Sequence, residues 1–211
     1  MKIFALPLTV APTEQYFSSL LIHEITHIIR TEEGHPSHNF LLLSSILNDY
    51  SLKHELSDKD TSMLREALQH VQDIYADDIG FLIFRDSLDR SVIEDFFTSW
   101  VKDYGPSENN QANLEGTNQI ASTIASNAFA LASLKRRGYN SSAETKIRKA
   151  NSRFLKQAFP YTSFERVLDI YSKIVLHLTS LPHSDLSEEK FKNEIDVYFD
   201  KLSEARVLAL S

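Results

Sequence analysis

The feature that most constrains this chain is a long helical run near its N-terminus. Residues 13–33 contain no proline or glycine, and residues 17–29 are rich in apolar side chains, so they are predicted to form a helix that is buried on most sides. Three ionisable residues interrupt this run, His23, Glu24 and His27, in the order His-Glu-x-x-His. Buried polar side chains need partners, and a metal ion is one partner that this pattern could bind.

The spacing of the two histidines favours a metal site. Residues four apart lie one turn apart on the same face of a helix, so both rings can reach one ion at a Zn–N distance of about 2.0–2.1 Å. Glu24 points about 100° away around the helix axis, which leaves it free to act on a bound water. The alternative is that His23 and His27 are ordinary core histidines beside a buried glutamate.

A catalytic zinc site normally has three protein ligands, so a third must come from elsewhere in the chain. In the helix predicted over residues 59–83, His70, Asp73 and Asp77 form one stripe. A neighbouring stripe of the same helix is apolar and is expected to pack against the protein core: Leu64, Leu68, Val71, Tyr75 and Leu82. Asp78 lies at the margin of this apolar stripe. We therefore expect Asp73 to bind the metal and Asp77 to accept a hydrogen bond from a ligand histidine. His70 is a possible additional ligand or donor.

The two segments together resemble the gluzincin group of zinc metallopeptidases. The pattern His23-Glu24-Ile25-Thr26-His27, followed by Asp73-Ile74-Tyr75-Ala76-Asp77, is similar to the HExxH and Glu-x-x-Ala-Asp motifs of that group. The resemblance implies that His23, His27 and Asp73 are zinc ligands, Glu24 is the general base and Asp77 supports the site. Asp73 stands where the family has glutamate, so its shorter side chain requires the two helices to approach more closely.

Composition excludes several other classes of function. The chain has no cysteine, which excludes disulfides, thiolate ligands and the cysteine-ligated peptide deformylases. Its net charge of −7 argues against general nucleic-acid binding. Residues 134–159 nevertheless hold eight basic side chains and one acidic one, which are expected to form a solvated helix end and face, with Lys135, Arg136 and Arg137 preceding the helix stop at Gly138.

The remaining pattern predicts a mainly α fold. Residues 1–10 could form at most one short strand, and the other expected segments are helical, with a helix stop at Gly34 and a capping box at Ser57 and Asp60. One domain over residues 1–211 is expected, with a possible subdivision near residues 105–114. His35 and His38 are expected in a loop and His177 in the core. The further helices are expected over residues 39–55, 91–104, 116–137, 141–158, 163–180 and 187–209.

These observations lead to one main hypothesis and one alternative. The chain is expected to be a compact, zincin-like helical domain that acts as a cytoplasmic, zinc-dependent metallopeptidase on a peptide or protein substrate, with no membrane or nucleic-acid partner. The alternative is a helical interaction protein whose metal site is structural or vestigial and carries out no catalysis. The sequence does not determine the oligomeric state or the substrate.

Overall fold

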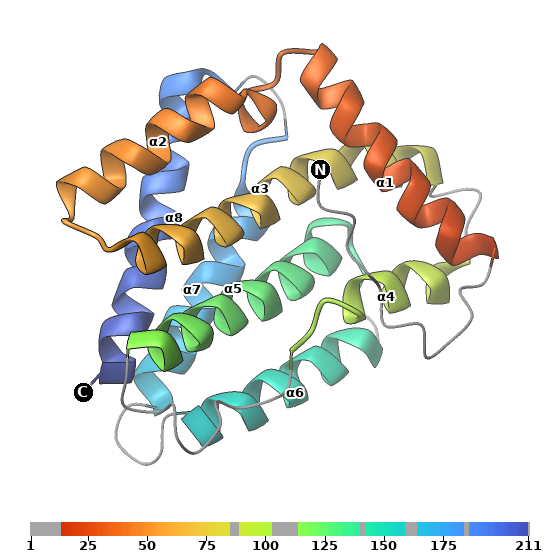
Figure 1. Ribbon diagram of the computed structural model, residues 1–211. Helices are drawn as coiled ribbons and strands as arrows, with labels where there is room; N and C mark the ends of the chain where they lie inside the picture. The colour runs from red at the N-terminus through yellow and green to blue at the C-terminus, as the bar shows by residue number, and fades with distance from the viewer. Residues whose placement is uncertain are drawn as a thin grey trace.

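The computed structural model describes residues 14–84, 89–102, 114–139, 142–158, 164–183 and 186–210. Within these residues every regular element is a helix, which confirms the mainly α prediction. Figure 1 shows their arrangement. The helices are α1 (Glu14–Glu32), the 3₁₀ helix η1 (Pro36–His38), α2 (Phe40–Lys53), α3 (Asp58–Phe84), α4 (Arg90–Thr98), α5 (Leu114–Arg136), α6 (Ser142–Ala158), α7 (Phe164–Ser180) and α8 (Glu188–Leu210).

Helix α5 is the centre of the fold. It packs against α3, α4, α6, α7 and α8, and nearly all of its residues from 117 to 134 are buried. Many of these residues are alanine, serine or threonine, and such small side chains allow five neighbouring helices to approach closely. In Figure 1, α3 and α5 lie side by side in the middle, with α7 and α8 behind them and α6 along the lower edge.

Most helix ends follow the local signals in the sequence. Ser57 and Asp60 form the expected capping box, because the backbone N–H of each donates to the side chain of the other at 3.3 Å. Gly34 and Gly138 adopt positive φ angles of 65° and 73° just after α1 and α5, where an L side chain would be strained. The helix stops predicted at these two glycines are therefore confirmed.

Helix α4 ends earlier than predicted, at Thr98 rather than near residue 104. Side chains of α5 form hydrogen bonds with the backbone that follows α4. Ser126 Oγ donates to the carbonyl of Trp100 at 2.9 Å, and Asn127 both accepts from Lys102 N–H at 2.8 Å and donates to its carbonyl at 2.9 Å. Because these groups are already paired with α5, they are not available to continue the helix.

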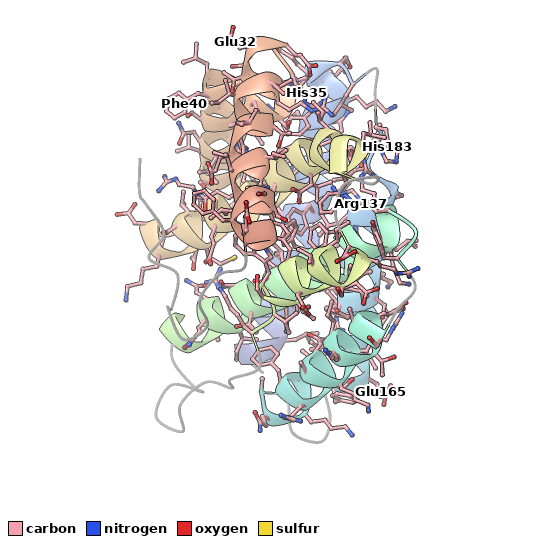
Figure 2. All side chains as sticks on the ribbon, turned by 90° about the vertical axis from the view of Figure 1, so that its right-hand side faces the viewer. Glu32, His35, Phe40, Arg137, Glu165 and His183 are labelled. Atoms are coloured by element: carbon pink, nitrogen blue, oxygen red, sulfur yellow. The ribbon has the colours of Figure 1, made fainter. Side chains whose placement is uncertain are left out.

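Two predictions fall outside the described residues: the strand over residues 1–10 and most of the proposed boundary near residues 105–114. Among the described residues, no helix is long and apolar enough to cross a membrane. Helix α1 lies at the side of the fold, where it packs mainly against α3, α4 and η1. Figure 2 looks onto this side, with Glu32 and His35 marking the end of α1 and the start of η1.

Candidate metal centre

Helix α1 turns polar side chains toward the protein and apolar side chains toward solvent. Its buried side chains include Ser19, His23 and Thr26, and none of its described residues belongs to the buried apolar core. Four large apolar residues on its outer side are 42–62% exposed: Phe17, Leu21, Ile25 and Ile28. The expectation that this helix is buried on most sides was therefore wrong, because the buried side chains among its described residues are polar and four of its large apolar ones face solvent.

Helices α1 and α3 approach each other closely at Gly80. A Cβ atom placed on Gly80 would lie 3.6 Å from Thr26 Cγ2 and 4.0 Å from Ile22 Cγ2, so the absence of a side chain brings α1 onto α3. Gly80 follows Asp73 and Asp77 at intervals of seven and three residues, and so continues their stripe on α3. The C-terminal half of α1 is also fixed, since Arg30 Nε donates to the carbonyl of Tyr75 at 2.9 Å.

The structure brings His23, His27 and Asp73 together. The Nε2 atoms of the two histidines are 3.1 Å apart, and Asp73 Oδ1 lies 3.3 Å from His27 Nε2 and 3.8 Å from His23 Nε2. In a triangle with sides of 3.1, 3.3 and 3.8 Å, the point equidistant from the corners lies about 2.0 Å from each, which is the usual zinc bond length. The donor set and its spacing therefore fit one zinc ion.

Asp77 holds the other side of the His23 ring. Its Oδ1 atom accepts a hydrogen bond from His23 Nδ1 at 2.8 Å, and its side chain is only 2% exposed. Burial alone would lower the pKa of His23, but the negative charges of Asp77, Asp73 and Glu24 outweigh it and raise this pKa to about 9. In the metal-free protein His23 is therefore an imidazolium at neutral pH, with its Nε2–H directed at His27 Nε2.

The opposite side of His27 contacts η1, which was not foreseen from the sequence. His27 Nδ1 lies 2.8 Å from His38 Nε2, and His38 Nδ1 lies 2.8 Å from Ser37 Oγ. Ser37 Oγ in turn lies 2.8 Å from His35 Nδ1. Burial and nearby positive groups lower the pKa of His38 to about 3 and that of His35 to about 4. The His-Pro-Ser-His segment is thus an ordered part of the centre.

Behind the centre, the basic end of α5 is buried rather than solvated. Arg136 forms a two-armed ion pair with Asp78, whose closest contact is 2.7 Å, and its side chain is fully buried. Arg137 also pairs with Asp78, at 3.4 Å, and lies over the Phe81 ring. The expectation of solvated basic side chains was therefore wrong for Arg136 and Arg137, because helix packing carries them onto an acidic position of α3. The side chain of Lys135 is 34% exposed, and the basic residues Lys146, Arg148 and Lys149 of α6 are exposed as expected.

Two details of the α3 prediction were also wrong. Asp78 does not lie among apolar side chains but pairs with these two arginines, and Leu82 is 72% exposed instead of packing inward. The other members of the apolar stripe are buried, and Tyr75 is among the largest fully buried side chains. The buried apolar stripe of α3 therefore does not extend to Leu82.

The remaining candidates lie apart from the three donor atoms. His70 is buried, stacks on Phe129 at 5.1 Å and is not part of the group that could hold one ion. His177 is satisfied by the carbonyl of Glu194, to which its Nε2 donates at 2.9 Å, as expected for a core histidine. Glu24 is exposed on the solvent side of α1.

The residues of the centre differ in their exposure to solvent. The cavity beside His23 and Asp77 measures only about 10 Å³, so it cannot hold a substrate group. The side chain of His27 is 25% exposed, compared with 8% for His23, and Glu24 follows on the same open side. Of the three donor side chains, that of His27 is therefore the most exposed to solvent.

Comparison with known proteins identifies a family but no activity. No curated protein and no solved structure matches the chain at a significant level. Residues 9–151 match a family described as a family of unknown function, DUF5781. This segment includes α1, η1 and α3, and hence every residue of the candidate centre. The match covers more than half of the sequence, and the chain therefore belongs to the DUF5781 family.

Proposed function

We propose that this protein is a zinc-dependent metallopeptidase with a zincin-like pair of site helices, α1 and α3. The observation that carries the proposal is the position of three donor atoms, from His23, His27 and Asp73, which surround a point about 2.0 Å from each. Three protein ligands and an open solvent side are the arrangement expected of a catalytic rather than a structural zinc site.

The packing of α1 supports a functional site. A helix that buries polar residues and exposes apolar ones gains little hydrophobic stabilisation from its docking, since about 25 cal/mol is gained per Å² of apolar surface removed from water. Its buried face instead holds His23 against Asp77 and places His27 near Asp73. The arrangement favours ligand geometry over packing energy, as is common at functional sites.

The close approach at Gly80 supports Asp73 as a ligand. Aspartate is one methylene shorter than the glutamate of gluzincins, so it can reach the same ion only if the helices lie closer together. Gly80 supplies this closeness, because its missing side chain lets Thr26 and Ile22 of α1 pack directly on α3. The shorter ligand and the glycine lie on the same stripe of α3.

In the proposed reaction each residue has a separate role. A zinc ion held by His23, His27 and Asp73 would polarise the substrate carbonyl and lower the pKa of a bound water toward about 7. Glu24, on the open side, would take a proton from the attacking water and deliver it to the leaving amide nitrogen. Asp77 would hold His23 in the tautomer that leaves its Nε2 free for the ion.

The test compares the metal content and the hydrolytic activity of two glutamine variants. Wild-type protein should bind one zinc per chain and cleave bonds in an unfolded protein mixture read by mass spectrometry. Glu24→Gln should keep the zinc and lose about 10²–10⁴-fold in cleavage rate, since a general base is removed. Glu32→Gln, an exposed glutamate on the same helix, should keep both properties.

Other outcomes would contradict the proposal in different ways. Zinc bound by wild-type protein without cleavage of any component would favour the alternative, a structural centre in an interaction protein. Absence of stoichiometric zinc would refute the metal site itself. Equal loss of cleavage in Glu24→Gln and Glu32→Gln would show that Glu24 has no special role.

A further inference from the structure

The hydrogen bonds of η1 form a single chain that ends at the metal centre. It runs from His35 Nδ1 to Ser37 Oγ, then to His38 Nδ1, and from His38 Nε2 to His27 Nδ1, with each step 2.8 Å long. Ser37 is fully buried, and the side chain of Arg30, which bonds to Tyr75, holds the adjoining part of α1 against α3. These hydrogen bonds therefore connect η1 to α1, and both segments are packed.

A backbone N–H at the His35 end determines which atom donates and which accepts in each of these hydrogen bonds. The N–H of Ser37 donates to His35 Nδ1 at 3.3 Å, so that nitrogen carries no proton. The Ser37 hydroxyl must then donate its only proton to His35 Nδ1, and it can accept only from His38 Nδ1–H. A neutral His38 has no second proton, so its Nε2 accepts from His27 Nδ1–H.

The same reasoning assigns the reactive side of His27. A neutral imidazole that carries its proton on Nδ1 has a lone pair on Nε2, and this atom is the one directed at Asp73 and His23. The backbone N–H of Ser37 thus selects, through the side chains of His35, Ser37 and His38, the tautomer of His27 that can bind a metal. Asp77 accepts the Nδ1 proton of His23 through one direct bond.

We infer that His38 is a positioning residue for the metal centre, which accepts the Nδ1 proton of His27 and fixes both the orientation and the tautomer of that ring. Its role in catalysis rests on the proposed function. Its role as the acceptor for His27 does not, because it follows from the contacts of η1 alone.

The local structure of η1 suits this role. His35 caps the helix, Pro36 occupies its first turn, and His38 N–H donates to the His35 carbonyl at 2.8 Å. Proline restricts the backbone before folding, so little conformational entropy is lost on placing His38. Asn39 then caps α2 by accepting from Leu42 N–H at 3.2 Å, which holds the far side of the turn.

The experiment compares two replacements of His38. Glutamine can place its amide oxygen near the position of Nε2 and still accept from His27, whereas leucine cannot. His38→Leu should weaken Zn²⁺ affinity 10–100-fold in chelator competition, as loss of the partner of a ligand histidine typically does. His38→Gln should stay within about threefold of wild type. His54→Leu, an exposed histidine after α2, is the matched control and should leave affinity unchanged.

A spectroscopic measurement separates positioning from a general effect on stability. With Co²⁺ in place of Zn²⁺, the visible absorption band should change in His38→Leu and match wild type in His38→Gln. Equal affinities and equal spectra for wild type and His38→Leu would overturn the inference. So would an equal loss in the glutamine and leucine variants, since the retained acceptor would then have no effect.

The inference can fail separately from the proposed function. ¹⁵N spectra of the metal-free wild-type protein report histidine tautomers without any metal. We expect the Nδ1–H tautomer for His27 and His38 and the Nε2–H tautomer for His35. An Nε2–H tautomer of His27 would refute the role of His38 even if zinc binds. Failure to bind zinc, with the expected tautomers present, would refute the metallopeptidase and leave His38 as the acceptor for His27.

Discussion

The buried charge on His23 should make the stability of the metal-free protein fall as the pH rises. The pKa of His23 is about 9 in the folded protein and about 6.5 in an unfolded chain. Between these values the folded state holds one proton more than the unfolded state, so the free energy of unfolding decreases with pH. At about 1.4 kcal/mol per pKa unit, His23 should contribute about 3 kcal/mol that is fully present below pH 6.5 and lost by about pH 9.

Urea unfolding in the presence of a chelator would measure this effect at pH 6.5, 8 and 9.5. The variant His23→Asn should lack most of the pH dependence. The lowered pKa values of His35 and His38 act in the opposite sense and only at lower pH, since those rings are neutral when folded and become protonated more easily when unfolded. At pH 6.5 half of the unfolded chains still carry each of these protons, so each ring lowers the stability there by about 0.4 kcal/mol, and this effect is gone by about pH 8.

Adding Zn²⁺ should cancel the trend. Because the ion would take the position of the His23 proton, apparent zinc affinity should rise up to tenfold per pH unit below pH 9, and zinc should stabilise the protein more at pH 8 than at pH 6.5. A wild-type stability that does not change between pH 6.5 and 9.5, or that changes equally in His23→Asn, would refute this reasoning about the site.

Three further outcomes follow from the packing around the centre. Arg136→Ala should destabilise the protein by about 1.5–3 kcal/mol in urea unfolding, because it removes the two-armed partner of the Asp78 carboxylate, which keeps only Arg137 and His183. Lys149→Ala, at an exposed position of α6, should change stability by no more than about 0.5 kcal/mol. Similar values for the two variants would contradict the burial of Arg136. Gly80→Ala should be tolerated and could stabilise α3 by up to about 1 kcal/mol. Gly80→Leu should separate α1 from α3 and weaken zinc binding. Unchanged zinc binding in Gly80→Leu would argue against the close approach of the two helices. Asp73→Ala should lower zinc affinity more than Asp77→Ala does, and the reverse order would show that the ligand is misassigned.

The local parts of this centre could be predicted from the sequence. Histidines four residues apart must share a helical face, and the interval from Asp73 to Asp77 places both carboxylates on one stripe, so the spacing alone indicated which atoms could meet. Helix ends marked by glycine or a capping box were predictable for the same reason. In each case the determining contacts lie within one turn of helix.

The parts that were missed depend on contacts between distant segments. Nothing near Arg136 in the sequence indicates that Asp78 lies opposite it, 58 residues away. His38 was assigned to a loop because the turn after Gly34 has no periodicity, yet η1 folds back onto α1 and brings it to His27. The outward apolar face of α1 was missed because composition does not show which side of a helix is covered.

The polar inner face of α1 also determines how this helix should open. None of its described residues joins the apolar core, so α1 loses less apolar burial of its own on detachment than a core helix would. Its detachment should therefore be one of the easier local fluctuations of the protein, visible as fast amide hydrogen exchange. An ion held by two side chains of α1 and one of α3 must be released before the helix can leave. At a free zinc concentration 100 times its dissociation constant, release costs about 2.7 kcal/mol, so the amides of α1 should exchange about 100-fold more slowly than in the metal-free protein. Exchange along α1 would then report occupancy of the centre directly, before any substrate is known.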